Sequence, residues 1–127
     1  MILKIIKQVT NATRYSIDGV RYMFDSEFAA RIEIYGFLGV LILMVILSVP
    51  GQFFVSAVIL FLILLAMEAI NTAIEVIIDR VSPEISNTGK RAKDLGSFAV
   101  MCLVFANAAH LIFALSQAEL TLLKNLI

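Results

Sequence analysis

The chain has 127 residues, of which 61% are hydrophobic and 16% charged, and its formal net charge is zero. A soluble domain of this length cannot bury so much apolar surface, so the composition excludes a soluble protein and indicates an integral membrane protein. The one cysteine, Cys102, excludes an intrachain disulfide and a zinc cluster. Since no nucleic-acid-binding motif is present, we expect no nucleic-acid partner.

Residues 1–24 are predicted to form an amphipathic helix on the membrane surface. Apolar residues recur there at steps of three and four, and basic residues occupy the rest of the helix. A basic amphipathic helix of this kind lies in the plane of the lipid headgroups. Packing against a partner subunit is compatible with the same pattern.

Three later segments are long and apolar enough to cross a bilayer. The first is predicted over residues 28–49, after the helix start Asp25-Ser26 and before the turn Pro50-Gly51. The second covers 52–80 and the third 92–116, with a polar loop over 81–92 and an amphipathic or frayed tail over 116–127. The predicted fold is therefore all-α: a surface helix plus three transmembrane helices in a single domain, residues 1–127.

The distribution of basic residues predicts how the chain is oriented in the membrane. Of its ten lysines and arginines, all but Lys124 lie ahead of the apolar part of the first span or between the second and third spans. Positively charged segments remain in the cytoplasm. We therefore expect a multi-pass protein of the cytoplasmic membrane, with the N-terminus and the 81–92 loop inside and the C-terminus outside.

The second span carries a stripe of polar residues near its end. Glu68, Asn71, Glu75 and Asp79 are spaced so that they share one face of a helix. A helix that enters the bilayer at residue 52 reaches Glu68 after about 24 Å, just short of the far side of hydrocarbon about 30 Å thick. An acid at that depth is a candidate functional residue. The alternative is a helix that leaves the membrane with ordinary surface acids.

Carboxylates near a lysine at the membrane interface favour Mg²⁺ and a phosphate ligand. Mg²⁺ binds in proteins through one or two carboxylates together with substrate phosphates, and phosphoryl transfer requires chiefly positioning and neutralised charge. The chain has neither a P-loop, since Gly89-Lys90 lacks the rest of that motif, nor the signatures of protein kinases. A kinase of this sequence would have an unrelated architecture.

The segments 68–75, 79–80 and 93–97 closely resemble the signature of the prokaryotic diacylglycerol kinase family. Residues 12–16 and 26–31 resemble the N-terminal segment of the same family, and the resemblance extends from about Lys7 to Leu115. It implies a homotrimeric helical bundle of three-span protomers with active sites between subunits. It further implies that Mg-ATP phosphorylates a membrane lipid alcohol.

The resemblance also implies roles for individual residues. Glu68 would be the general base, and Glu27 and Glu75 would bind Mg²⁺. The implied ATP-binding residues are Tyr15, Glu27, Glu75, Glu84, Ile85, Ser86, Lys93 and Asp94, with Ser86 at a position where many relatives carry histidine. The implied lipid-substrate residues are Arg31, Glu33, Glu68, Asn71 and Ser97.

The favoured function is therefore ATP-dependent phosphorylation of diacylglycerol to phosphatidic acid, and undecaprenol is the alternative substrate within the same fold. A non-enzymatic membrane subunit or a transporter is the alternative of another class. A transporter should carry its charges near the bilayer midplane, whereas here they gather at one interface. Outside the site, His110 and Asn107 are expected to form interhelical hydrogen bonds, with catalysis as the lesser alternative. Lys90 and Arg91 are expected to mark topology and attract anionic lipid, with contact to phosphate as the lesser alternative.

Overall fold

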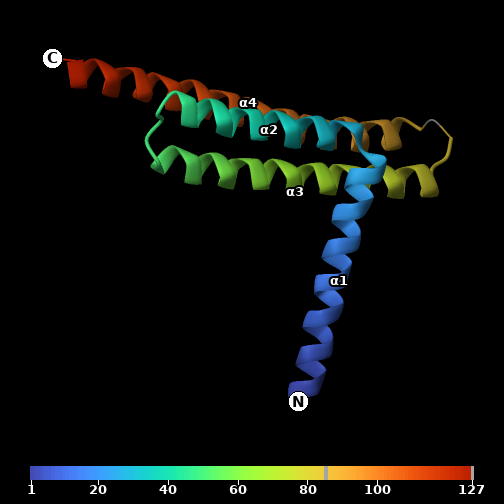
Figure 1. The fold of residues 1–127 in the computed structure, drawn as a ribbon. Coiled ribbons are helices and arrows are strands. Elements are labelled where there is room, and N and C mark those ends of the chain that lie inside the picture. Colours follow the sequence, from blue (N-terminus) through green and yellow to red (C-terminus); the bar gives the residue numbers. More distant parts are fainter. Residues whose placement is uncertain (85, 127) are drawn as a thin grey trace. The chain divides into compact units, whose positions relative to one another are not determined.

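The computed structural model describes residues 1–84 and 86–126, with side chains up to Ala118. All regular structure in these residues is helical (Figure 1): α1 (Ile2–Ser26), α2 (Phe28–Ile46), α3 (Gln52–Val81) and α4 (Asn87–Leu126). The three helices α2, α3 and α4 are long and apolar enough to cross a membrane. The predicted all-α fold with three spans is thus confirmed. The homotrimer stays a prediction, because one chain is described.

The chain divides into two compact units, Met1–Tyr35 and Gly36–Ile127. In the first unit, α1 ends at Ser26, and Glu27 takes an extended backbone conformation (φ −105°, ψ 106°) between α1 and α2. The Arg31 guanidinium donates a hydrogen bond to the Phe24 carbonyl at 2.9 Å, which satisfies an acceptor left over at the end of α1. None of the residues of α1 is buried, which suits a helix whose apolar face meets lipid or a partner.

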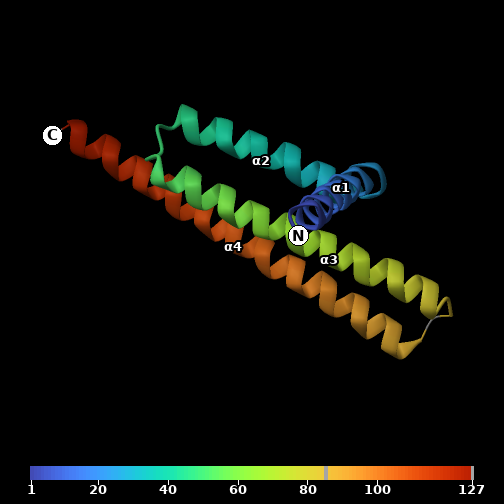
Figure 2. The ribbon, with the colours of Figure 1, turned by 90° about the horizontal axis from the view of Figure 1, so that it is seen from below.

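In the second unit, α3 and α4 form an antiparallel helical hairpin, and α2 from Gly36 onward runs beside α3 (Figures 1 and 2). The core lies at the end of the hairpin near the α2–α3 turn, where Met44 and Val49 pack with three alanines, Ala57, Ala114 and Ala118. The rings of Phe37 and Phe61 stack with centroids 3.9 Å apart. Small side chains let the helix backbones approach closely, as is usual for packing in membranes.

Helix α2 ends at Ile46, earlier than the predicted residue 49. The backbone N–H of Val49 donates to the Met44 carbonyl and that of Ser48 to the Val45 carbonyl, each at 3.0 Å. Ser48 has a positive φ of 53°, so this is a Schellman motif with serine where glycine is usual. Met44 and Val49 are both buried, which supplies the apolar contact that accompanies the motif. The turn therefore begins before Pro50.

Helix α4 begins at Asn87, whereas the sequence predicted a start near Ala92. The cause is a cap: Ser86 Oγ accepts a hydrogen bond from the Gly89 backbone N–H at 3.0 Å. The connection between α3 and α4 is correspondingly short. At its other end α4 continues to Leu126, so the predicted tail over 116–127 is helical as far as the described residues reach.

Polar contacts link α3 to α4 inside the apolar region. Ser56 Oγ and His110 Nε2 lie 2.7 Å apart, and Asn107 Nδ2 donates to the Leu60 carbonyl at 3.4 Å. Asn107 Nδ2 also donates to the Leu103 carbonyl of its own helix at 2.9 Å. The predicted interhelical hydrogen bonding by His110 and Asn107 is confirmed.

Candidate active site

The predicted polar stripe lies on one uninterrupted helix, α3. Glu68, Asn71 and Glu75 are half-buried, and Asp79 is exposed. Asn71 Nδ2 donates a hydrogen bond to Glu75 Oε1 at 3.1 Å. Asn71 therefore holds one oxygen of the Glu75 carboxylate in place, and the second oxygen can take another ligand.

Asn71 is itself placed by a glycine on the facing helix. A Cβ atom added at Gly96 would overlap with Asn71 Oδ1. Helix α4 can pass this close to Asn71 only because position 96 has no side chain. Gly96 thus stabilises the conformation in which Asn71 donates to Glu75.

We expect Gly96→Ala to lower both stability and activity. The added methyl group must displace Asn71, and overpacking of this kind costs about 1–3 kcal/mol. Thermal unfolding in detergent measures the first effect, and the rate of the lipid phosphorylation that the resemblance implies measures the second. Gly39→Ala is the matched control, because a Cβ at position 39 of α2 meets no atom within 4 Å. Wild-type stability and rate in Gly96→Ala would contradict the assignment.

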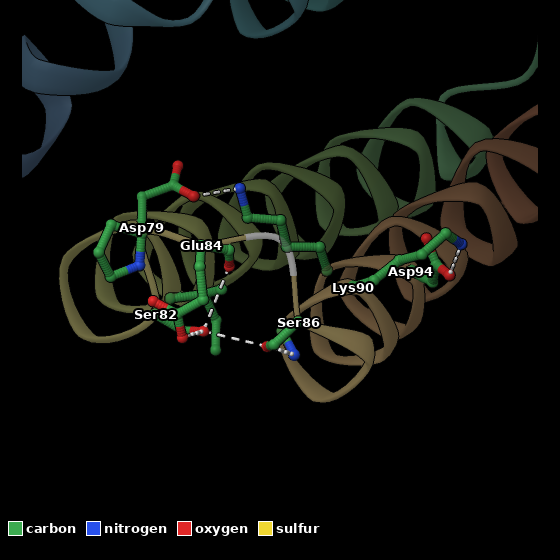
Figure 3. A pocket seen from close by; sticks show the side chains of 10 residues that line it. Asp79, Ser82, Glu84, Ser86, Lys90 and Asp94 are labelled. Carbon is green, nitrogen blue, oxygen red and sulfur yellow. Dashed lines mark hydrogen bonds and ion pairs between the residues drawn. The ribbon is translucent and has the colours of Figure 1, made fainter.

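A pocket of about 270 Å³ lies where α3 ends and α4 begins (Figure 3). Its lining comes from the last turn of α3, the connecting loop and the first two turns of α4. The polar residues that line it are Asp79, Ser82, Glu84, Ser86, Lys90, Lys93 and Asp94. Both cationic and anionic groups are therefore present, so the pocket offers partners for an anionic group and for hydrogen-bond donors of a ligand.

Two ion pairs hold the lysines of the pocket. Lys93 Nζ bonds to Asp79 and so ties α4 to the end of α3. Lys90 Nζ lies 2.6 Å from Asp94 Oδ2, one turn further along the same helix. Because these pairs are exposed, each contributes only about 0–1 kcal/mol to stability. Their importance is that they place two ammonium groups, which bind phosphate as point charges, at one pocket.

Glu84 is anchored within the loop. Its own backbone N–H and the Ser82 hydroxyl, which is 2.8 Å from Glu84 Oε1, lower the pKa of the Glu84 carboxyl below its ordinary value. The side chain is exposed. It therefore presents an ionised, acceptor-only group to whatever enters the pocket.

The structure gathers four of the predicted ATP-binding residues, Glu84, Ser86, Lys93 and Asp94, at this pocket. Glu75 lies one turn before Asp79 on α3 and is not part of the lining, and Ile85 is outside the described residues. Of the predicted lipid-substrate residues, Glu68 and Asn71 lie on α3, and Ser97 is exposed on α4 beside Gly96. The remaining predicted residues belong to the first compact unit: Tyr15, Glu27, Arg31 and Glu33.

Three polar side chains of the pocket were missing from the predicted ATP-binding residues: Asp79, Ser82 and Lys90. Asp79 was visible as the last member of the polar stripe. The spacing of Lys90 and Asp94 by four residues is a signal that could have placed Lys90 at the site; the sequence had instead indicated a topology marker. No pattern pointed to Ser82.

Carboxylates are suitable ligands for Mg²⁺, but the described carboxylates alone are too few to complete its coordination. Among the residues whose placement is described, no group of three histidine, cysteine or acidic side chains could hold a metal ion. Mg²⁺ needs no such cage, since one or two carboxylates with substrate phosphates complete its ligands. The oxygen of Glu75 that Asn71 leaves available suits this use.

The sequence profile described as prokaryotic diacylglycerol kinase matches residues 14–115, which include both the polar stripe and the pocket. The chain belongs to the prokaryotic diacylglycerol kinase family. A diacylglycerol kinase from Sinorhizobium sp is 47% identical over 105 residues, covering 83% of this chain and 76% of that protein. The diacylglycerol kinase of Haemophilus influenzae is 30% identical over 111 residues (78% and 86%), and that of Escherichia coli K12 30% over 105 residues (76% and 80%). The resemblance stated above is thus confirmed, and the chain is a membrane-bound lipid kinase.

Proposed function

We propose that the protein transfers the γ-phosphate of ATP to diacylglycerol, which yields phosphatidic acid. The observation that carries this proposal is the composition of α3. The helix bears Glu68 and Glu75 on one face and ends at the pocket that contains Lys93. The helix that carries an acid at membrane depth therefore also contributes its last turn to the pocket proposed for a water-soluble phosphate donor.

In the proposed reaction, Glu68 removes the proton from the lipid hydroxyl. The hydroxyl oxygen forms a bond to the γ-phosphorus, the bond from that phosphorus to the bridging oxygen breaks, and ADP leaves with the electron pair. The proton ends on the Glu68 carboxylate. A positioned general base accelerates such a step by about 10²–10⁴-fold.

The other residues bind and orient the two substrates. Lys93 and Asp94 contact the nucleotide, together with Tyr15, Glu84, Ile85 and Ser86, and the lipid is bound by Arg31, Glu33, Asn71 and Ser97. Glu27 and Glu75 would hold Mg²⁺, and Asn71 orients Glu75 for this role. When bound, Mg²⁺ neutralises charge on the transferring phosphoryl group.

The proposal includes the place of the protein in the cell. We place it in the cytoplasmic membrane as a homotrimer, with the N-terminus and the α3–α4 loop in the cytoplasm and the C-terminus outside. The excess of basic residues on one side supports the orientation. The many large apolar side chains that a single chain leaves exposed along the spans support both lipid contact and assembly.

A lipid panel tests the proposal. The purified protein in mixed micelles receives Mg-ATP labelled at the γ-phosphate and, in separate reactions, diacylglycerol, undecaprenol or no lipid. We expect label in phosphatidic acid and none in the lipid-free control. Phosphorylation of undecaprenol but not of diacylglycerol would show that the protein is a lipid kinase with undecaprenol as its substrate. Absence of transfer to either lipid, by protein whose helical content is intact, would overturn the proposed function.

A further inference from the structure

A continuous run of hydrogen bonds connects the start of α4 to the Glu84 carboxylate (Figure 3). The Gly89 backbone nitrogen lies 3.0 Å from Ser86 Oγ. Ser86 Oγ lies 3.0 Å from Ser82 Oγ, which in turn lies 2.8 Å from Glu84 Oε1. Two side chains of the loop, Ser82 and Ser86, therefore lie between a helix terminus and an acid.

The chemistry of the groups sets the direction of every bond in this run. An ionised carboxylate only accepts, and a hydroxyl has a single hydrogen to donate. Ser82 must therefore donate to Glu84, and Ser86 must donate to Ser82. Ser86 then accepts from the Gly89 N–H. All the bonds point the same way, an arrangement in which each strengthens the next.

The same series of hydrogen bonds explains how the exposed Glu84 side chain is kept in one position. Within the described part of the chain, Lys93 is bonded to Asp79 and Lys90 to Asp94. The anchors of Glu84 are its own backbone N–H and the Ser82 hydroxyl. All of these residues line the same pocket, so Ser82 fixes a pocket carboxylate that is paired with no lysine of the described residues.

We propose that Ser82 is a positioning residue of the nucleotide pocket: its hydroxyl holds Glu84 in place to accept a hydrogen bond from the nucleoside part of ATP. The inference rests on the proposed function. A carboxylate repels phosphate oxygens but accepts from a ribose hydroxyl or a base amine. The phosphates are matched by the lysines of α4, which lie at the same pocket. Ser82 acts through Glu84 and does not touch the reacting atoms.

Ser82→Ala in the full-length protein tests the inference. We expect the KM for ATP to rise roughly 3- to 10-fold, because a charge-assisted hydrogen bond that fixes Glu84 is lost. We expect kcat to stay unchanged, because the contact is made equally in the ground and transition states. Ser82→Thr retains the hydroxyl and should restore the wild-type KM. Thr88→Ala, an exposed hydroxyl removed from the first turn of α4, is the matched control and should leave KM unchanged.

A cycle with Glu84→Ala, which removes the acceptor, separates positioning from a general loss of structure. If Ser82 acts through Glu84, Ser82→Ala changes KM little in the Glu84→Ala background. An unchanged KM in Ser82→Ala, equal impairment in Ser82→Thr, or additive effects in the cycle would each overturn the inference.

Binding of a non-hydrolysable ATP analogue, measured without lipid, separates this inference from the proposed function. Wild-type protein that binds the analogue but phosphorylates no lipid defeats the proposed function alone, and weaker binding by Ser82→Ala would still support the role of Ser82. Wild-type protein that does not bind the analogue defeats both.

Discussion

Glu68→Gln is expected to abolish lipid phosphorylation and to leave the fold and the subunit assembly intact. The substitution keeps the size of the side chain but removes the carboxylate that we propose takes the proton from the lipid hydroxyl. The turnover number at saturating lipid and Mg-ATP should fall by about 10²–10⁴-fold. Size-exclusion chromatography in detergent and binding of an ATP analogue should match the wild type.

The control for this substitution is an acid-to-amide change away from the stripe. Asp18 lies on α1, is exposed and is 3.9 Å from the Arg21 guanidinium. Asp18→Asn should therefore retain nearly full turnover. A Glu68→Gln protein with wild-type turnover would refute the role of general base.

Glu75→Gln should weaken the dependence on Mg²⁺ while retaining the local structure. The amide oxygen of glutamine can still accept the hydrogen bond that Asn71 donates at 3.1 Å, so the change isolates the charge. Mutation of a residue that hydrogen-bonds to a metal ligand lowers metal affinity roughly 10- to 100-fold. Loss of the charge of the ligand itself should therefore lower the Mg²⁺ affinity at least about 10-fold.

The measurement for Glu75→Gln is the initial rate as a function of free Mg²⁺ at fixed ATP. We expect the midpoint to move to higher Mg²⁺ and the rate at saturating Mg²⁺ to recover in part. Glu68→Gln, in contrast, should leave the Mg²⁺ dependence of analogue binding unchanged. A midpoint that does not move in Glu75→Gln would count against metal binding by this residue.

The sequence predicted the helices well because long apolar runs have few alternative structures, but it placed some of their ends wrongly. Ser48 gave no sign of a left-handed turn, since glycine is the residue that usually marks one. Asn87, Thr88 and Gly89 have weak helix propensity and indicated a loop. A single cap from Ser86 makes them the first turn of α4, because it satisfies a donor that would otherwise be left over.

The site was predictable where it follows helical spacing or family resemblance. The stripe from Glu68 to Asp79 could be predicted from the spacing of its residues along one helix. Resemblance supplied Glu84, Ser86, Lys93 and Asp94, and the structure brings these four to one pocket. Ser82 was not predictable, because its bonds depend on the backbone path of an irregular loop. The roles of Tyr15 and Glu27, which lie in the other compact unit, stay predictions.

The contacts of Ser56 with His110 and of Asn107 with Leu60 have a consequence for the distant pocket. Hydrocarbon offers no competing donors or acceptors, so sliding α4 along α3 by one turn, about 5.4 Å, would strand these groups. These hydrogen bonds therefore resist sliding of α4 along α3. The alignment of Lys93 with Asp79, about 26 Å from His110 along α4, is thus set in part by side chains that no substrate reaches.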